Sequence, residues 1–486
     1  MTDTRLYVNG AWREGRERRG GRVVNPATGE EIGRVAHAGA SDVRDAIDAA
    51  EAALPAWRRT SAARRGEVLG CAAAILAERK ESAAVALTRE QGKTLAESRA
   101  EMDRAIDTLA WHADRAARLA EPRAAGGGGA VVHPEPIGVV GAFTPWNYPA
   151  VIIARKLGAA LAAGCTVVLK AAEETPAIAA HIVAALEEAE LPAGVVNLVF
   201  GDPPAIAEQV LDASVVRALS FTGSTAVGKR LAERAARRLV RCVLELGGHA
   251  PVLVFADAGL DAAVASIAAY KFECAGQSCN APSRIYVERP LYEPFVHALA
   301  DVARALRVGD GMDARTDMGP MANARRVAAM ERLTSDARAR GATVVTGGGR
   351  PCAPGWFWSP TVLADVPDGA AVLAEEPFGP IVPVSPFDTA DEAIALANAT
   401  PYGLAAYVFT RSEAIAERAT RELEAGSVGV NELRGVPPDV GIAGVKESGY
   451  GYEGGGAGVE EFVNLKVVRG TGLEDAAVGH RLSALG

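Results

Sequence analysis

From Ile137 onward, short apolar segments alternate with longer helical segments, and this alternation constrains the fold more than any other feature. Strands are predicted at Gly138–Phe143, Thr166–Lys170, Val195–Phe200, Ala218–Phe221, Cys242–Leu246 and Val252–Phe255. Helices are predicted between them at 150–163, 177–190, 203–212 and 225–239. Because such units place parallel strands in one sheet with crossover helices on its faces, the pattern predicts a doubly wound α/β domain.

A second alternating series follows, from Asp261 to about Arg421. Its strands are expected near 284–288, 343–346, 381–384 and 405–409. The first forty residues instead indicate short strands and turns, and Ser41 is a candidate N-cap for a helix over Val43–Trp57. Further helices are expected at 61–80, 81–91 and 95–119, and Gly126–Gly129 indicates a hairpin tip or linker. A length of 486 residues therefore fits two α/β domains and a smaller β element.

Composition narrows the class of protein. With 49% hydrophobic residues and 60 acidic against 51 basic side chains, the chain is neither disordered nor strongly basic. This balance argues against nucleic acid or an anionic membrane as a partner. No export signal or membrane span is predicted, and the six cysteines are expected to be reduced thiols in the cytoplasm. The scattered histidines predict no metal site.

Several predicted strands end in residues that could bind a ligand or take part in a reaction. In Phe221–Gly228, small residues join a strand to a helix, where backbone N–H groups can face a pyrophosphate; a plain tight turn is the alternative. Asn147, between two prolines, can present a neutral amide at the edge of the sheet or act only as a turn residue. Lys170 and Glu173 can reach ribose hydroxyls or form a solvated ion pair.

Cys279 and Glu245 are the candidate nucleophile and base. Cys279 follows Gly-Gln-Ser, so its thiolate can be stabilised at an exposed loop, although most cysteines are simply packed in cores. Glu245 ends a predicted strand before two glycines and can act as a general base if the fold brings it close.

Taken together, the motifs resemble the NAD(P)-dependent aldehyde dehydrogenase superfamily over essentially the whole chain. They are Thr144-Pro-Trp-Asn-Tyr-Pro, Val168-Leu-Lys, Phe221-Thr-Gly-Ser, Leu244-Glu-Leu-Gly-Gly, Gly276-Gln-Ser-Cys, Glu375-Glu-Pro-Phe-Gly-Pro and Lys446-Glu-Ser-Gly-Tyr-Gly. They stand in the family's order and at its spacing.

The resemblance implies NAD-dependent oxidation of an aldehyde to a carboxylic acid. Cys279 would form a thiohemiacetal and then a thioester, and Glu245 would activate the water that hydrolyses it. The Asn147 amide and the Cys279 backbone N–H would hold the oxyanion. Glu453 matches a position sometimes assigned to proton relay. The alternatives are a semialdehyde dehydrogenase, a CoA-acylating relative and a catalytically silent NAD-binding relative.

The same resemblance implies the cofactor site and the assembly. Residues expected around the dinucleotide are Thr144, Trp146, Lys170, Glu173, Gly223, Ser224, Leu246, Glu376 and Phe378. A carboxylate at Glu173 favours NAD over NADP. The expected fold has an NAD-binding domain (1–117 and 138–247), a catalytic domain (248–447) and an oligomerisation element (118–137 and 448–486). A homodimer or homotetramer is implied.

Departures from the family's pattern bear on the substrate. In relatives that act on succinate semialdehyde, two arginines bind the distal carboxylate. Arg155 matches the first, but Glu273 occupies the second position. Ile442 stands where an aromatic residue is usual, which leaves extra width. These differences favour a medium-sized aldehyde over succinate semialdehyde.

Overall fold

The structure is a computed structural model, and it describes residues 3–119, 123–125, 130–351 and 354–469. Its largest sheet has eight strands in the order β19-β11-β10-β7-β8-β9-β1-β2. They are β1 (Leu6–Val8), β2 (Ala11–Arg13), β7 (Val139–Phe143), β8 (Thr166–Lys170), β9 (Val196–Val199), β10 (Val216–Thr222), β11 (Arg241–Glu245) and β19 (Gly449–Tyr450). The five central strands are parallel, and β1, β2 and β19 add antiparallel edges.

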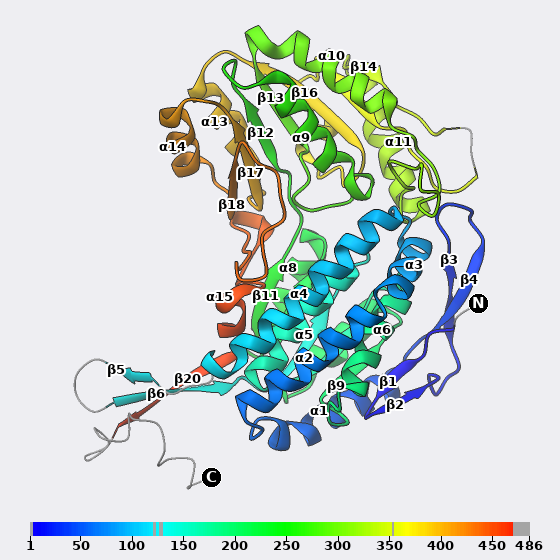
Figure 1. Cartoon of the computed structure of the whole chain (residues 1–486), viewed down its shortest axis with the longest axis vertical. Coiled ribbons are helices and arrows are strands. Elements are labelled where there is room, and N and C mark those ends of the chain that lie inside the picture. Colours follow the sequence, from blue (N-terminus) through cyan, green and yellow to red (C-terminus); the bar gives the residue numbers. More distant parts are fainter. Residues whose placement is uncertain (1–2, 120–122, 126–129, 352–353, 470–486) are drawn as a thin grey trace.

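Eight helices surround this sheet in two layers. They are α1 (Ala40–Trp57), α2 (Ala62–Glu78), α3 (Lys80–Gln91), α4 (Leu95–Leu119), α5 (Pro149–Ala163), α6 (Pro176–Glu188), α7 (Pro203–Asp212) and α8 (Thr225–Ala236). The neighbouring helices α1, α7 and α8 pack on one face, and α5 and α6 pack on the other. In Figure 1, α2, α4 and α5 lie side by side, so the second face carries an additional helical layer.

The second sheet has seven strands in the order β14-β15-β16-β13-β12-β17-β18. They are β12 (Pro251–Val254), β13 (Arg284–Glu288), β14 (Thr343–Thr346), β15 (Thr361–Ala364), β16 (Ile381–Phe387), β17 (Ala405–Phe409) and β18 (Ser427–Val430). All neighbours are parallel except β14 and β15. Its helical segments are α9 (Leu260–Phe272), the 3-10 turn η1 (Glu273–Gly276), α10 (Arg289–Ala305), α11 (Ala324–Ala339), α12 (Ala371–Ala374), α13 (Ala390–Asn398) and α14 (Glu413–Glu422).

Two smaller sheets complete the fold. One pairs β3 (Gly20–Val24) with β4 (Glu31–Ala36), and the other joins β5 (Arg123–Ala125), β6 (Ala130–Pro136) and β20 (Val463–Arg469). Near the C-terminal end lie the short segments η2 (Lys446–Ser448) and α15 (Gly455–Glu460). Figure 1 shows the β5–β6–β20 sheet projecting from the lower left of the molecule. The predicted α/β fold, with two doubly wound sheets and a smaller β element, is therefore confirmed.

The predicted start of the first helix is wrong by two residues. The N-cap of α1 is Gly39 and not Ser41. The carboxylate of Asp42, at the third helical position, accepts hydrogen bonds from the backbone N–H groups of the N-cap Gly39 (2.9 Å) and of Arg16 (3.1 Å), so it fixes the start of the helix from within. The glycines at 126–129, interpreted as a hairpin tip or linker, lie outside the described residues.

Candidate functional site

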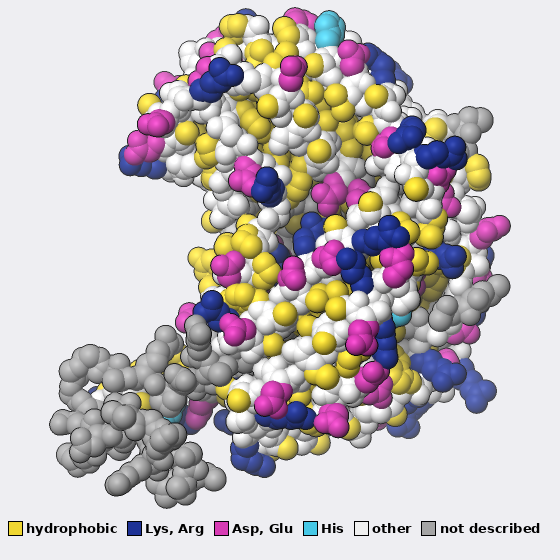
Figure 2. All heavy atoms as spheres, viewed as in Figure 1, with side chains coloured by type: hydrophobic (Ala, Val, Ile, Leu, Met, Phe, Trp, Pro, Cys, Tyr) yellow, Lys and Arg dark blue, Asp and Glu magenta, His cyan; other side chains and the backbone are white. Residues whose placement is uncertain are grey.

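The two large sheets face one another across a cavity of about 470 Å³. Figure 2 shows the molecule hollowed between its upper and lower lobes. The residues that follow β7, β10 and β11 reach this cavity, as do the segments after η1 and before α11. Ligands of open α/β sheets bind beyond the carboxyl ends of the strands, so the topology itself places a site here.

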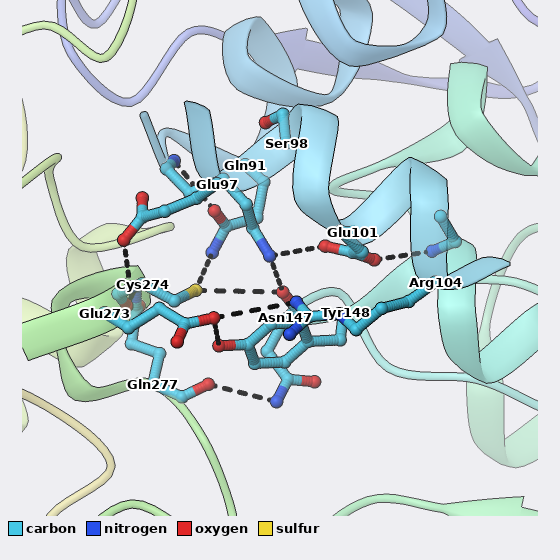
Figure 3. A network of polar contacts seen from close by, with 12 residues as sticks. Gln91, Glu97, Ser98, Glu101, Arg104, Asn147, Tyr148, Glu273, Cys274 and Gln277 are labelled. Carbon is cyan, nitrogen blue, oxygen red and sulfur yellow. Dashed lines mark hydrogen bonds and ion pairs between the residues drawn. The ribbon is translucent and has the colours of Figure 1, made fainter. Parts of the chain in front are cut away.

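Asn147 lies in the turn between β7 and α5, and its position is fixed from several sides (Figure 3). Its side chain is buried, and its Nδ2 donates to the Gln277 carbonyl oxygen at 3.0 Å. Its own carbonyl oxygen accepts from Lys93 Nζ at 2.7 Å, and Lys93 forms a fully buried ion pair with Glu101 at 2.5 Å. An amide nitrogen carries two N–H groups, so one remains free to donate to a substrate oxygen.

Cys279 follows a turn with an unusual backbone. Cys274 (φ 52°), Ala275 (φ 51°) and Gly276 (φ 70°) lie in the left-handed region, which costs free energy for residues with a side chain. Glu97 stabilises this turn by accepting the Cys274 backbone N–H at 2.8 Å. The turn delivers Cys279, which is partly exposed, to the wall of the cavity.

A main-chain contact joins Cys279 to the other half of the site. A Cβ atom at Gly248 would lie 2.1 Å from the Cys279 carbonyl oxygen, so only glycine permits this approach. Gly248 comes three residues after Glu245, the last residue of β11. Glu245 and Cys279 therefore line the same cavity, although Glu245 ends a strand of the first sheet and Cys279 lies in the segment before β13 of the second sheet.

The electrostatics of the pair favour its protonated forms in the free enzyme. Burial and the nearby carboxylate of Glu453 raise the pKa of Glu245 to about 8, and Glu245 Oε1 has no hydrogen-bond partner among the described residues. Burial and the carboxylates of Glu245 and Glu376 raise the pKa of the Cys279 thiol above its usual range. An unpartnered carboxyl group with a pKa near neutrality is suited to general base catalysis.

Glu453 is held behind Glu245 by a buried lysine that the sequence analysis did not identify. Lys156 Nζ lies 2.5 Å from Glu453 Oε2 and also donates to Ser220 Oγ at 2.9 Å. Thr222 Oγ1 donates to the same Glu453 oxygen at 3.1 Å. In the sequence Lys156 follows Arg155 within helix α5 and resembles a surface lysine, so only the structure reveals that it is buried against a partner.

The residues predicted to bind the cofactor at the first sheet lie beyond the ends of its parallel strands, where Gly223 and Ser224 line the cavity. Ser224 is the N-cap of α8 and makes no side-chain cap hydrogen bond; the N–H groups of Val227 and Gly228 donate to its carbonyl oxygen, which leaves the first N–H groups of the helix for an anion. A Cβ at Gly228 would lie 2.3 Å from a Leu246 methyl carbon, so the helix packs tightly on the strand. Lys170 Nζ and the Gly201 N–H each lie 2.8 Å from the Glu173 carboxylate and hold it in place.

Of the remaining residues predicted to bind the cofactor, Trp146, Leu246, Glu376 and Phe378 line the cavity and Thr144 does not. Trp146 and Phe378 meet edge to face with ring centroids 5.6 Å apart. Glu376 Oε1 accepts the Gly248 N–H at 3.0 Å, and burial raises the pKa of Glu376 to about 7. The Thr144 hydroxyl is buried and has no partner among the described residues. With Gly223 and Ser224 beside the cavity, these groups suit a dinucleotide, which presents anionic phosphates and ribose hydroxyls.

A family model described as "Aldehyde dehydrogenase family" matches residues 12–468. The chain belongs to this family. It is 46% identical over 469 residues to 4-(hydroxymethyl)benzenesulfonate dehydrogenase of Comamonas testosteroni, with 95% of this chain and 97% of the relative covered. It is 40% identical to the NADP(+) succinate-semialdehyde dehydrogenase of Escherichia coli strain K12, with 96% and 98% covered.

The fold agrees with that of solved aldehyde dehydrogenases. The crystal structure of succinate-semialdehyde dehydrogenase from Burkholderia pseudomallei matches with a TM-score of 0.93 and 40% identity, covering 96% of this chain and 97% of that one. This aldehyde dehydrogenase is therefore an oxidoreductase that acts on aldehydes, and its family uses NAD(P). Within the described residues, no helix combines the length and apolar character needed to span a membrane, and no cluster of candidate ligands could hold a metal.

Proposed function

We propose that this aldehyde dehydrogenase oxidises its substrate through a covalent intermediate on Cys279. The observation that carries the proposal is the meeting of one thiol, one neutral amide and one carboxyl group in a single cavity, at Cys279, Asn147 and Glu245. Attack by the Cys279 sulfur on the aldehyde carbon gives a thiohemiacetal. The free N–H of the Asn147 amide and the Cys279 backbone N–H stabilise the oxygen that becomes negative.

Glu245 serves as the base. Its unpartnered oxygen can accept a proton from the water that attacks the thioester, which releases the carboxylic acid and restores the thiol. Glu453, which is ion-paired with Lys156, would pass that proton onward. A catalytically silent relative would have no need for a buried, unpaired carboxyl group, which costs folding free energy.

NAD is the cofactor that we propose, with NADP less favoured. When bound, the dinucleotide supplies the acceptor for the hydride that leaves the thiohemiacetal. Thr144, Lys170 and Glu173 would contact its adenosine half, Gly223 and Ser224 its phosphates, and Trp146, Leu246, Glu376 and Phe378 its nicotinamide half. The preference rests on Glu173, which is fixed by two contacts and would oppose the 2′-phosphate of NADP.

Three further proposals concern the roles of the domains, the assembly of subunits and the cellular location. The domain containing the first sheet binds the cofactor, and the domain containing the second sheet supplies the nucleophile. The β5–β6–β20 sheet joins subunits into a homodimer or homotetramer, since its outer strand exposes Leu465 and Val467 by more than half. The five described cysteines are free thiols, which fits a reducing cytoplasm.

The direct test follows NADH absorbance at 340 nm while the protein, NAD and a panel of aldehydes are mixed. Cys279→Ala should abolish turnover, whereas the control Cys71→Ser, at an exposed thiol outside the cavity, should not change it. Glu245→Gln should leave a rapid burst of about one NADH per subunit followed by slow turnover. Turnover by Cys279→Ala at the wild-type rate would refute the proposal.

A further inference from the structure

The cavity has a cationic region on the side of α4 and α5. Arg155 on α5 lines the cavity and is partly buried. Among the described residues, its guanidinium group has no hydrogen bond and no ion pair. Since a partly buried guanidinium group loses hydration without a partner, it is available to an anion.

Glu273 faces the same region, but its charge is already compensated. Its Oε1 accepts the hydroxyl of Tyr148 at 3.1 Å and lies 3.6 Å from Arg104 Nη2 (Figure 3). Arg104 comes from α4, far from Glu273 in the chain, so the sequence does not reveal this pairing. Arg104 therefore offsets much of the repulsion that Glu273 alone would exert on an anionic substrate.

Arg104 itself retains unused hydrogen-bonding capacity. Its contact with Glu273 is an ion pair too long to be a hydrogen bond, and its Nε and Nη2 are buried with no hydrogen-bond partner among the described residues. Its guanidinium carbon lies 5.5 Å from the centre of the Tyr148 ring. Tyr148 and Glu273 thus orient a guanidinium group that lines the cavity, and because the Arg104 side chain is 42% exposed, its accessible edge can donate to a ligand.

The balance of charge at this end is positive. Two guanidinium groups, Arg104 and Arg155, stand against the single carboxylate of Glu273. Glu453 is paired with Lys156, and Arg434 at the rim is paired with Glu432 at 3.0 Å. Tyr270, Tyr407 and Ile442 also line the cavity and give it an apolar wall.

We propose that Arg104 is a specificity-determining residue that, together with Arg155, binds a single anionic group at the far end of the aldehyde. The matching substrate class is an aldehyde with an apolar body and one terminal carboxylate or sulfonate. Both anions accept several N–H donors in the geometry that guanidinium groups offer. Glu273 and Tyr148 hold Arg104 in place. This inference rests on the proposed aldehyde oxidation at Cys279.

The test compares an anionic aldehyde with a neutral analogue of similar shape. The probes are 4-formylbenzoate and its methyl ester, assayed with saturating NAD. In the wild type, kcat/KM should favour 4-formylbenzoate by about tenfold or more, as expected for one hydrogen bond to a charged group. Rising NaCl should reduce this preference, because the site is open to solvent and screened by salt.

Arg104→Gln should lower the preference by about tenfold, chiefly through KM, because the distant anion binds equally in the ground and transition states. Glu273→Gln should raise the preference. The double variant Arg104→Gln/Glu273→Gln should fall between the wild type and Arg104→Gln, since it also removes the unpaired carboxylate. Arg104 is a cleaner target than Arg155, whose charge also lowers the pKa of Glu245.

Three results would overturn the inference. They are equal kcat/KM for the two probes in the wild type, an Arg104→Gln variant that loses activity equally on both, and a preference that does not respond to salt. If Arg104→Gln does not fold, the wild-type preference, its salt dependence and the Glu273→Gln variant decide alone. Oxidation of the methyl ester reports on the proposed chemistry at Cys279, so failure of that chemistry is distinguishable from failure of the specificity argument.

Discussion

Burial does most to raise the pKa of Glu245, and the ion pair between Lys156 and Glu453 should adjust the pH at which this enzyme becomes active. The two partners act on Glu245 in opposite directions, because the charge of Glu453 raises its pKa and the charge of Lys156 lowers it. Glu245 works as a base only when deprotonated, so the rate after the first turnover should rise with pH. With a pKa of about 8, only about a tenth of the Glu245 side chains are deprotonated at pH 7.

The rise of the rate with pH forms one limb of the pH–rate profile. Neutralising Glu453 should shift this limb in one direction along the pH axis, and neutralising Lys156 should shift it in the other. Glu453→Gln removes a negative charge and leaves Lys156 unpaired, so the limb should shift to lower pH. The rate at pH 7, relative to the plateau above about pH 9, should then at least double. Lys156→Gln leaves Glu453 unpaired and should shift the limb to higher pH.

The assay is the steady-state rate of NADH formation after the burst, measured from pH 6 to about pH 10, which spans the limb on both sides. Glu245→Gln is the control, because it should have no such limb. Breaking a buried ion pair destabilises the fold by about 3–5 kcal/mol, so each variant is first checked by thermal unfolding. A shift in the same direction for both variants would mean that packing and not charge governs the effect, and the reasoning would be refuted.

Two further predictions concern Asn147 and Glu173. Asn147→Ala should lower kcat about a hundredfold, or on the order of 3 kcal/mol, because one oxyanion donor is lost, and a change confined to KM would contradict this role. The wild type should show the higher kcat/KM with NAD than with NADP, by about tenfold for a difference of about 1.4 kcal/mol. Glu173→Ser should narrow that ratio, and a wild type that prefers NADP would refute the role of Glu173.

Local patterns predicted much of the first sheet because its strands are apolar runs separated by helical segments, and this alternation is visible without knowledge of which strands pair. The strand Thr166–Lys170 and the helix at 203–212 have the boundaries that the sequence predicts. The strand Thr361–Ala364 was not predicted, because its short apolar run lies in a region rich in glycine and proline and is stabilised by its neighbours β14 and β16. The cap of α1 was misplaced because Asp42 bonds back to Gly39, a contact that periodicity does not reveal.

The sequence predicted those residues of the candidate site that stand at strand ends. It did not predict the residues whose role depends on partners far away in the chain. Glu245 ends β11, and its place at the edge of the sheet follows from the strand pattern. Lys93 and Lys156 resemble ordinary surface lysines in sequence, yet each is buried against an acidic partner. The compensation of Glu273 by Arg104 likewise required the packing of α4 against η1.

The contact between Gly248 and the Cys279 carbonyl oxygen has a consequence for how the enzyme cycles. Backbone lies against backbone here, and a Cβ at Gly248 would come within 2.1 Å of that oxygen. The spacing between nucleophile and base is thus built into the main chain and does not have to be recreated at each turnover. If Cys279 and Glu245 act as proposed, substrate and cofactor would meet a reaction chamber whose two reacting groups are held in place before either ligand binds.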